Sequence, residues 1–358
     1  MENLVTVLSK FRGKRVLITG DTGFKGSWLS FWLLQYGADV YGYALPALTK
    51  SHFRSLRLDK SMDHKDGDVR DTEFLQKTFR KVQPEIVFHL AAQPIVRRSY
   101  RNPVETFETN VSGAVNLLEC VRLSDSVTSL VFVTSDKCYK NIEQVAGYTE
   151  SDQLGGHDPY SASKAAAELV FSSYNDSFFK QRQGFGAASG RAGNVIGGGD
   201  WSEDRIIPDC IRSLTANTPI ILRNPNATRP WQHVLEPLSG YIVLAERLMS
   251  DPKSVEGAWN FGPDEAETRT VHDVAQAAVG HWGSGSVEIE SNHSHPHEAN
   301  LLQLDCTKAR QQLQWAPRWH FAETVEKTVQ WYKQVEDGAK AIDVTTNQLS
   351  EYERKIHD

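Results

Sequence analysis

The chain has 358 residues, 40% of them hydrophobic, which allows one large domain or two with a full core. Its net charge of −6 offers no basic footprint for nucleic acid or an acidic membrane, and no apolar run approaches the roughly 20 residues of a membrane span. The four cysteines lack the paired spacing of a zinc site or a disulfide framework. Residues 1–14 are charged and have no apolar core, so we expect a cytoplasmic protein.

The first regular pattern is a strand, a glycine turn and a helix. Residues 15–19 form a short β-branched run, and Gly20, Gly23 and Gly26 follow before an amphipathic helix. Such glycines let the backbone approach a pyrophosphate, which the free N–H groups at the helix N-terminus then receive. Lys25 adds a positive charge. This order predicts a dinucleotide site, although a glycine pattern alone also occurs in structural turns.

The second and third predicted strands bear on which dinucleotide binds. Residues 39–43 form the second strand, which in a standard NAD site ends in an acidic residue that contacts the adenosine ribose. Here residues 44–46 are Ala-Leu-Pro, so we expect weaker holding of NAD, and the basic residues Lys50 and Arg54 keep NADP open. Asp68, after the third strand, could accept from the adenine amino group or form a cap or turn before the next helix.

The fourth predicted strand, residues 86–90, leads into the small residues Ala91 and Ala92, against which a ribose or nicotinamide could lie. His89 sits within the apolar strand, where a hydrogen-bonded core histidine is the expected role. A long helix over residues 110–121 comes next. Strands that alternate with helices so regularly predict a doubly wound parallel sheet, an α/β fold.

The fifth predicted strand, residues 130–134, breaks into a polar run that contains Asp136 and Lys137. A helix then opens and presents Tyr160 and Lys164 on one face, where the lysine ammonium would favour the tyrosine phenolate. Asp136 and Lys137 would bring a second acid and base to the same crevice at the carboxyl ends of the strands. Because Tyr-x-x-x-Lys spacing is common by chance, the pair gains weight only from the rest of the chain.

The pattern changes after a sixth strand at residues 186–191. A glycine-rich loop at 194–201 and short elements broken by prolines indicate a second, smaller domain of mixed structure. We predict a Rossmann domain over residues 1–193 with a returning segment near 230–262, a substrate domain over 194–335, and a polar tail over 336–358 without a periodic core signal.

Basic side chains are scattered through the loops of this second region. They are Arg205, Arg223, Arg229, His233 and His297. Scattered arginines usually belong to the solvated surface. A cluster of them opposite the nicotinamide would instead bind a diphosphate, because the guanidinium group is suited to bidentate hydrogen bonds with phosphate. The alternating histidines of residues 293–297 fit an exposed turn better than a metal tract, so we predict no metal site.

Taken together, the motifs resemble those of the extended short-chain dehydrogenase/reductase family. They are Thr-Gly-x-x-Gly-x-x-Gly at 19–26, His-Leu-Ala-Ala-Gln at 89–93, Asn110, Thr-Ser-Asp-Lys at 134–137 and Tyr-Ser-Ala-Ser-Lys at 160–164. Within that family, residues 10–330 resemble the nucleotide-sugar 4,6-dehydratases. The Asp-Lys pair, where dTDP- and GDP-sugar relatives have an acidic pair, is similar to the branch acting on CDP-glucose, as are Arg-Pro-Trp-Gln-His-Val at 229–234 and His-Glu-Ala at 297–299.

This resemblance implies an NAD-dependent internal redox cycle on CDP-D-glucose, a step toward deoxysugars of cell-surface polysaccharide. Tyr160, supported by Lys164 and Thr134, would deprotonate the C4 hydroxyl as its hydride leaves. Asp136 would protonate the departing C6 oxygen and Lys137 would remove the C5 proton, although these two roles could be exchanged. The hydride returns to C6 and gives CDP-4-keto-6-deoxy-D-glucose.

The resemblance also assigns binding residues. The cofactor would contact Tyr160, Lys164, Gly20, Gly23, Phe24, Lys25, Gly26, Asp68, Val69, Leu90, Ala91 and Ala92. The nucleotide sugar would contact Gln93, Asn194, Arg205, Arg229 and His297. Relatives pair through two helices, for which residues 101–123 and 159–180 are the candidates, so we expect a homodimer or homotetramer.

Two other classes of protein share part of this pattern. An NAD-dependent epimerase or reductase has the glycine turn and the Tyr-Lys pair, but it has no use for Asp136 and Lys137. A non-catalytic protein that senses the cofactor need not keep Tyr160. The full set of motifs therefore favours a dehydratase.

Overall fold

The computed structural model describes residues 3–264, 267–290 and 301–355. At its centre lies a sheet of seven parallel strands in the order β11-β6-β5-β4-β1-β2-β3. These strands are β1 Arg15–Thr19, β2 Asp39–Ala44, β3 Asp63–Asp66, β4 Ile86–His89, β5 Ser129–Val133, β6 Gly186–Ala192 and β11 Gly257–Phe261. The predicted doubly wound parallel sheet is confirmed.

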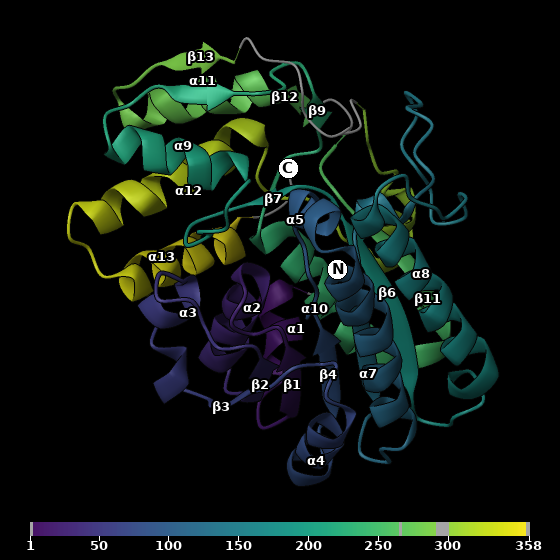
Figure 1. Ribbon diagram of the computed structural model, residues 1–358. Helices are drawn as coiled ribbons and strands as arrows, with labels where there is room; N and C mark the ends of the chain where they lie inside the picture. The colour runs from purple at the N-terminus through teal and green to yellow at the C-terminus, as the bar shows by residue number, and fades with distance from the viewer. Residues whose placement is uncertain (1–2, 265–266, 291–300, 356–358) are drawn as a thin grey trace.

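Helices cover both faces of this sheet, so its central strands are buried on both sides, and β4 and β5 are largely apolar runs. Alternate residues of β1 enter two cores: Val16 and Ile18 join one cluster, and Leu17 joins the other. The first cluster includes α1 Leu4–Ser9, α2 Phe24–Gln35 and α10 Leu235–Ser250, and the second includes α4 Thr72–Val82, α7 Gly113–Arg122 and α8 Pro159–Tyr174. Figure 1 shows α7 and α8 together on one face.

Apart from β11, the strands beyond β6 have only two or three residues. Three helices, α9 Ile206–Thr215, α11 Val271–Trp282 and α12 Phe321–Glu336, gather at the upper left of Figure 1. Small strand pairs join them: β7 Val195–Ile196 with β10 Gln232–His233, β8 Ile220–Leu222 with β13 Val287–Ile289, and β9 Thr228–Arg229 with β12 Arg269–Thr270. The remaining short helices are α3 His52–Ser55, α5 Val96–Arg101 and α6 Pro103–Phe107. The division into domains at residues 193 and 335 stays a prediction.

The C-terminal segment differs from the expected polar tail. Residues Ala341–Arg354 form helix α13, which buries Ala341, Val344, Thr345, Gln348, Leu349 and Tyr352. The buried positions recur every three or four residues, but two of them are polar, which hides the stripe in the sequence. Both polar side chains form hydrogen bonds inside the protein, because Thr345 accepts from Trp331 at 2.9 Å and Gln348 donates to the Lys327 carbonyl at 2.7 Å.

A glycine-rich loop joins this second region to the cofactor side of the sheet. The indole of Trp28 donates to the Gly198 carbonyl at 2.9 Å, and a side-chain carbon at residue 198 would come within 2.0 Å of the Trp331 ring. The loop is therefore held between α2 and α12, and the glycine is required by this close approach.

None of the helices described is long and apolar enough to cross a membrane. Across 3–264, 267–290 and 301–355, no group of three or more His, Cys, Asp or Glu residues could hold a metal ion. The histidines of residues 293–297, with the predicted substrate ligand His297, lie outside the residues that the structure describes.

Candidate active site

A large cavity of about 2140 Å³ runs along the carboxyl ends of the strands. One end is lined by the glycine turn after β1, the middle by the segment after β5 and the start of α8, and the other end by α9, β8 and the loop before β9. This is the crevice in which open α/β sheets bind ligands. All ten predicted cofactor residues outside α8 line it, and so do Thr134, Asp136, Lys137, Tyr160 and Lys164.

The glycine turn has the shape that a dinucleotide requires. Gly20 has a φ of +78°, and a side-chain carbon there would lie 2.7 Å from the Ala91 nitrogen. At Gly26 such a carbon would lie 2.1 Å from the Gly20 carbonyl oxygen. Gly23 is the N-cap of α2, and no side chain caps that helix, so its first-turn N–H groups can receive an anion. The residues present therefore fit a pyrophosphate.

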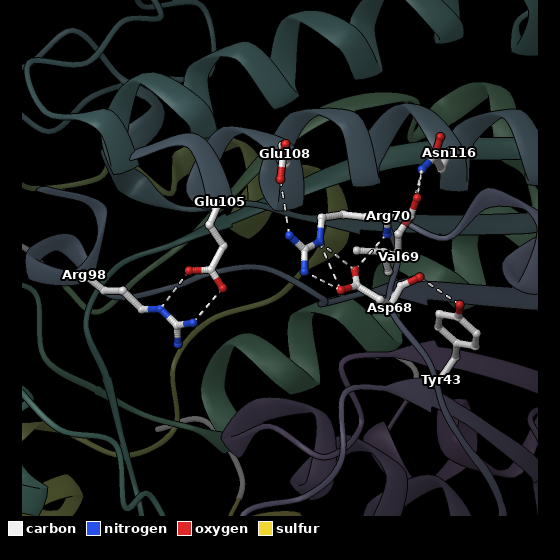
Figure 2. Close-up of polar contacts among 8 residues, drawn as sticks. All are labelled: Tyr43, Asp68, Val69, Arg70, Arg98, Glu105, Glu108 and Asn116. Carbon is white, nitrogen blue, oxygen red and sulfur yellow. Dashed lines mark hydrogen bonds and ion pairs between the residues drawn. The ribbon is translucent and has the colours of Figure 1, made fainter. Parts of the chain in front are cut away.

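The part of the cavity predicted to hold adenosine is lined by the apolar residues Ala44 and Leu45 and by the carboxylate of Asp68, which is hydrogen-bonded to Arg70. Figure 2 shows the Asp68 side chain turned toward Arg70, which donates from Nη2 at 2.6 Å and from its backbone nitrogen at 2.9 Å. The Arg70 hydrogen bond holds the pKa of Asp68 below its usual range. Asp68 thus forms a turn, while the N-cap of α4 is Asp71. The end of β2 presents Ala44 and Leu45 to the cavity, so weaker holding of NAD stays a prediction.

Tyr160 and Lys164 are both buried in the first two turns of α8. This helix begins as predicted, because the Asp158 carboxylate accepts from the Ser161 nitrogen at 3.0 Å and Pro159 fits the first turn. Burial raises the pKa of Tyr160 to about 12, and a hydrogen bond with Ser135 opposes that rise. Burial lowers the pKa of Lys164 to about 8. The tyrosine therefore becomes a base only with help from its neighbours.

The acid and base pair after β5 lies in a short 3₁₀ turn, Asp136–Cys138. Oδ1 of Asp136 accepts from Ser135 Oγ at 2.8 Å and lies 3.5 Å from Lys137 Nζ. The Lys137 ammonium also reaches Asn194 Oδ1 at 3.4 Å. Oδ2 of Asp136 is buried and has no hydrogen-bond partner in the described part of the chain, and it faces Gly193. That oxygen can carry a proton toward a ligand.

Two neighbouring hydroxyl groups, those of Thr134 and Ser135, bear on the predicted support of Tyr160, and the role of Thr134 stays a prediction. Thr134 Oγ1 donates to the buried carboxylate of Glu168, so its hydrogen is directed away from Tyr160. Ser135, the next residue, is the one hydrogen-bonded to Tyr160. Successive side chains at a strand end point to opposite sides, and the sequence offers hydroxyls at both positions without saying which side faces the tyrosine. The residue missed in the sequence is therefore Ser135.

Lys25 belongs electrostatically to the catalytic centre as well as to the glycine turn. Burial lowers the pKa of Lys25 to about 7, and nearby Arg205 lowers it further while Asp136 opposes the change. Its Nζ atom lies 5.8 Å from the centre of the Tyr241 ring. Several cations thus converge around the single carboxylate of Asp136, which favours anionic groups at this point.

The predicted substrate residues separate into two groups. Asn194, Arg205 and Arg229 line the cavity, and Arg205 donates to Asp200 at 2.8 Å. Gln93 does not line it, because its amide nitrogen donates to Thr106 Oγ1 at 2.9 Å and its oxygen accepts from the Ile95 nitrogen at 2.6 Å. These two bonds fix the turn after β4, and the expected contact of Gln93 with substrate stays a prediction.

Two histidines near the site are core residues. His89 hydrogen-bonds Thr19 Oγ1 at 2.7 Å, and burial lowers the pKa of His89 to about 3, as the sequence suggests. His233, expected among the diphosphate ligands, is fully buried against Trp28 and Trp319 instead, and burial lowers its pKa to about 3. Neither imidazole carries charge for an anionic ligand.

Comparisons with known proteins agree with this geometry. Residues 17–328 match the family model described as GDP-mannose 4,6 dehydratase. The chain is 50% identical to the CDP-glucose 4,6-dehydratase of Salmonella typhimurium, over 96% of this chain and 97% of that protein. It also resembles two solved structures. One is the dTDP-glucose 4,6-dehydratase of Streptomyces venezuelae with NAD and TYD bound, at 25% identity and a TM-score of 0.76, covering 91% and 99% of the two chains.

The second is the UDP-glucose 4-epimerase of Thermus thermophilus in complex with NAD, at 28% identity and a TM-score of 0.76, covering 89% and 98% of the two chains. Dehydratases and epimerases thus share this fold, and only the side chains of the cavity distinguish their chemistry. The family model covers the glycine turn, the Asp136–Lys137 turn and the Tyr160 helix in one span. The chain therefore belongs to the GDP-mannose 4,6 dehydratase family.

Proposed function

We propose that the chain is an NAD-dependent 4,6-dehydratase that converts CDP-D-glucose to CDP-4-keto-6-deoxy-D-glucose. The observation that carries the proposal is the pairing of Asp136 with Lys137 beside Tyr160 in one cavity. An epimerase needs no acid and base for elimination. The high identity to a CDP-glucose 4,6-dehydratase over nearly the whole chain supports the nucleotide assignment.

The cofactor half of the cavity suits NAD. The turn at Gly20, Gly23 and Gly26 would hold the pyrophosphate, and Leu90, Ala91 and Ala92 would lie against the nicotinamide riboside. When bound, NAD supplies the acceptor for the C4 hydride and later the donor to C6. Arg205 and Arg229 at the opposite end suit the diphosphate of the sugar.

The side chains of the middle of the cavity supply the proton transfers. Tyr160 takes the proton of the C4 hydroxyl, and the new ketone acidifies the C5–H bond. Lys137 removes the C5 proton while Asp136 gives its proton to the C6 oxygen, which leaves as water. Lys137 then returns a proton to C5.

The proton balance then favours a role for Ser135. Each turnover adds one proton to Tyr160 and removes one from Asp136, so the two residues must exchange a proton before the next cycle. Ser135 donates to Asp136 Oδ1 at 2.8 Å and is hydrogen-bonded to Tyr160. Its hydroxyl therefore lies on a direct route between them.

Pairing of two copies is part of the same proposal. The segments at 101–123 and 159–180 both expose large apolar side chains, among them Val104, Phe107, Leu169 and Phe178. Two such surfaces on neighbouring helices suit an isologous contact between copies. Sedimentation of the protein and of a Val104→Lys variant would show a dimer or larger for the first and a smaller species for the second.

The decisive experiment offers the purified protein NAD and CDP-D-glucose, with dTDP-, UDP- and GDP-glucose as competitors. Loss of one water, with formation of a 4-keto sugar and no net reduction of NAD, is the expected result with the cytidine nucleotide. Epimerised hexose of unchanged mass, or steady accumulation of NADH, would replace the dehydratase assignment with that of an epimerase or a simple dehydrogenase.

A further inference from the structure

Glu168 is a buried carboxylate on the catalytic helix, one turn beyond Lys164. Its Oε1 atom accepts from Thr134 Oγ1, and its Oε2 atom accepts from Ser189 Oγ at 2.9 Å and from Arg191 Nη2 at 2.7 Å. Both oxygens are thus engaged, and the side chain is only 2% exposed. A charged group buried so completely needs such partners, and these come from two separate strands.

Arg191 carries the network beyond the helix. Its side chain, 5% exposed, pairs with Glu168 and also donates to Tyr139 Oη at 2.8 Å and to the Glu150 carbonyl at 3.2 Å. Tyr139 in turn donates to Asn260 Oδ1 at 2.7 Å. Tyr139 directly follows the 3₁₀ turn of Asp136 and Lys137, so the network holds both ends of that turn, at Thr134 and at Tyr139.

We propose that Glu168 is a positioning residue for the proposed dehydration: its carboxylate fixes the Thr134–Tyr139 turn against α8, and its charge, balanced by Arg191, sets the electrostatic environment of Lys164 one helical turn away. Glu168 touches none of the reacting atoms in this role. Glu168 acts on the turn through the hydrogen bond that its Oε1 atom accepts from Thr134, and on Lys164 through the electrostatic effect of its negative charge. The inference rests on the proposed function, because it assumes that the Tyr160 and Lys164 pair performs the first proton transfer.

The charges around Lys164 explain why Glu168 matters to it. Burial lowers the pKa of Lys164 to about 8, and Glu168 is the strongest of the neighbours that oppose this lowering, followed by Cys138. Lys25 on α2 and His89 on β4 also interact electrostatically with Lys164, and His89 is neutral because burial lowers its pKa to about 3. Removing the negative charge of Glu168 leaves Arg191 unbalanced, so both effects lower the pKa of Lys164 further.

The test uses charge changes of opposite sign on the same network. Glu168→Gln should move the acid limb of the kcat profile to lower pH by roughly one unit, the effect of one charge at an effective dielectric constant of about 20. Arg191→Met leaves the carboxylate unbalanced and should move the limb to higher pH. Competitive labelling of Lys164 with trace acetic anhydride, in protein without substrate, should give the same two directions.

Two matched controls separate charge from position. Ser189→Ala removes one hydrogen bond to the same carboxylate without changing its charge, so the limb should stay in place. Thr134→Val removes the bond that fixes the turn, again without a charge change, and should lower kcat at least tenfold while leaving KM and the limb nearly unchanged. It also tests the positioning role if the Glu168→Gln protein does not fold.

The outcomes distinguish this inference from the proposed function. If wild-type protein dehydrates no nucleotide sugar, the function fails, whereas the labelling experiment still reports on Glu168 and Lys164. Charge variants that shift the limb and the labelling curve in the same direction, or not at all, would overturn the electrostatic role. A Thr134→Val enzyme with wild-type kcat would overturn the positioning role.

Discussion

Lys137 Nζ lies between two oxygens, 3.5 Å from Oδ1 of Asp136 and 3.4 Å from Oδ1 of Asn194. The acid and the base of the proposed elimination are therefore adjacent, and each has a neutral hydrogen-bonding neighbour, Ser135 for Asp136 and Asn194 for Lys137.

Replacement of either member should separate oxidation from elimination. Asp136→Asn or Lys137→Met should still allow oxidation at C4, because Tyr160 and Lys164 remain, but water should not leave. A single-turnover experiment should then show a lasting rise in the absorbance of reduced nicotinamide. Tyr160→Phe serves as the control and should show no rise. Wild-type turnover in deuterated water should place deuterium at C5, and variants that turn over at the wild-type rate would contradict these roles.

The cavity arginine Arg229 should contribute to substrate affinity rather than to cofactor affinity. Its side chain is only 7% exposed yet lines the far end of the cavity. Arg229→Ala should raise KM by about 10- to 150-fold, the loss of 1.5–3 kcal/mol expected for a charge-assisted hydrogen bond. NAD binding, measured by calorimetry, should change little. Arg122→Ala, at an exposed ion pair with Glu119 outside the cavity, is the matched control, and equal KM values for both variants would place the diphosphate elsewhere.

The pH dependence should follow the Tyr160 and Lys164 pair. The productive form carries one proton fewer than the fully protonated pair. The first proton to leave belongs mainly to Lys164, because burial lowers the pKa of Lys164 to about 8. Activity should therefore rise with pH and level off above about 8, and it should not fall again until the range in which Tyr160 titrates, near 12, or until unfolding intervenes. A profile of kcat that declines from pH 7 to pH 9 would contradict this order of ionisation.

The C-terminal helix should contribute to global stability. Leu349 is 3% exposed in α13, so Leu349→Ala should lower the free energy of unfolding by about 2–5 kcal/mol. Ile342→Ala, on the same helix but 38% exposed, should change it by less than about 1 kcal/mol. Urea denaturation of the two variants makes the comparison, and equal stabilities would restore the interpretation of residues 336–358 as an unpacked tail.

The fold could be read from the sequence because β1, β4 and β5 are short, largely apolar runs between helices, and because the glycine turn has few other uses at that position. The cavity lining followed from the same logic, since strand ends meet at one edge. Orientation of single side chains could not be read in this way. Thr134 and Ser135 differ only in the side of the strand they face, and Gln93 is held by Thr106, thirteen residues away. The apolar stripe of α13 was hidden by its buried threonine and glutamine.

The contact of Gly198 with Trp28 and Trp331 bears on attempts to transplant nucleotide preference between relatives. The two indoles come from α2, which follows the glycine turn, and from α12, and the glycine lies between them. Suppose that only the loop after β7 were replaced by the loop of a relative. Any side chain at residue 198 of the new loop would then disrupt the contacts of this position with Trp28 and Trp331. Chimeric enzymes of this family therefore need the loop and both tryptophan positions to be exchanged as one block.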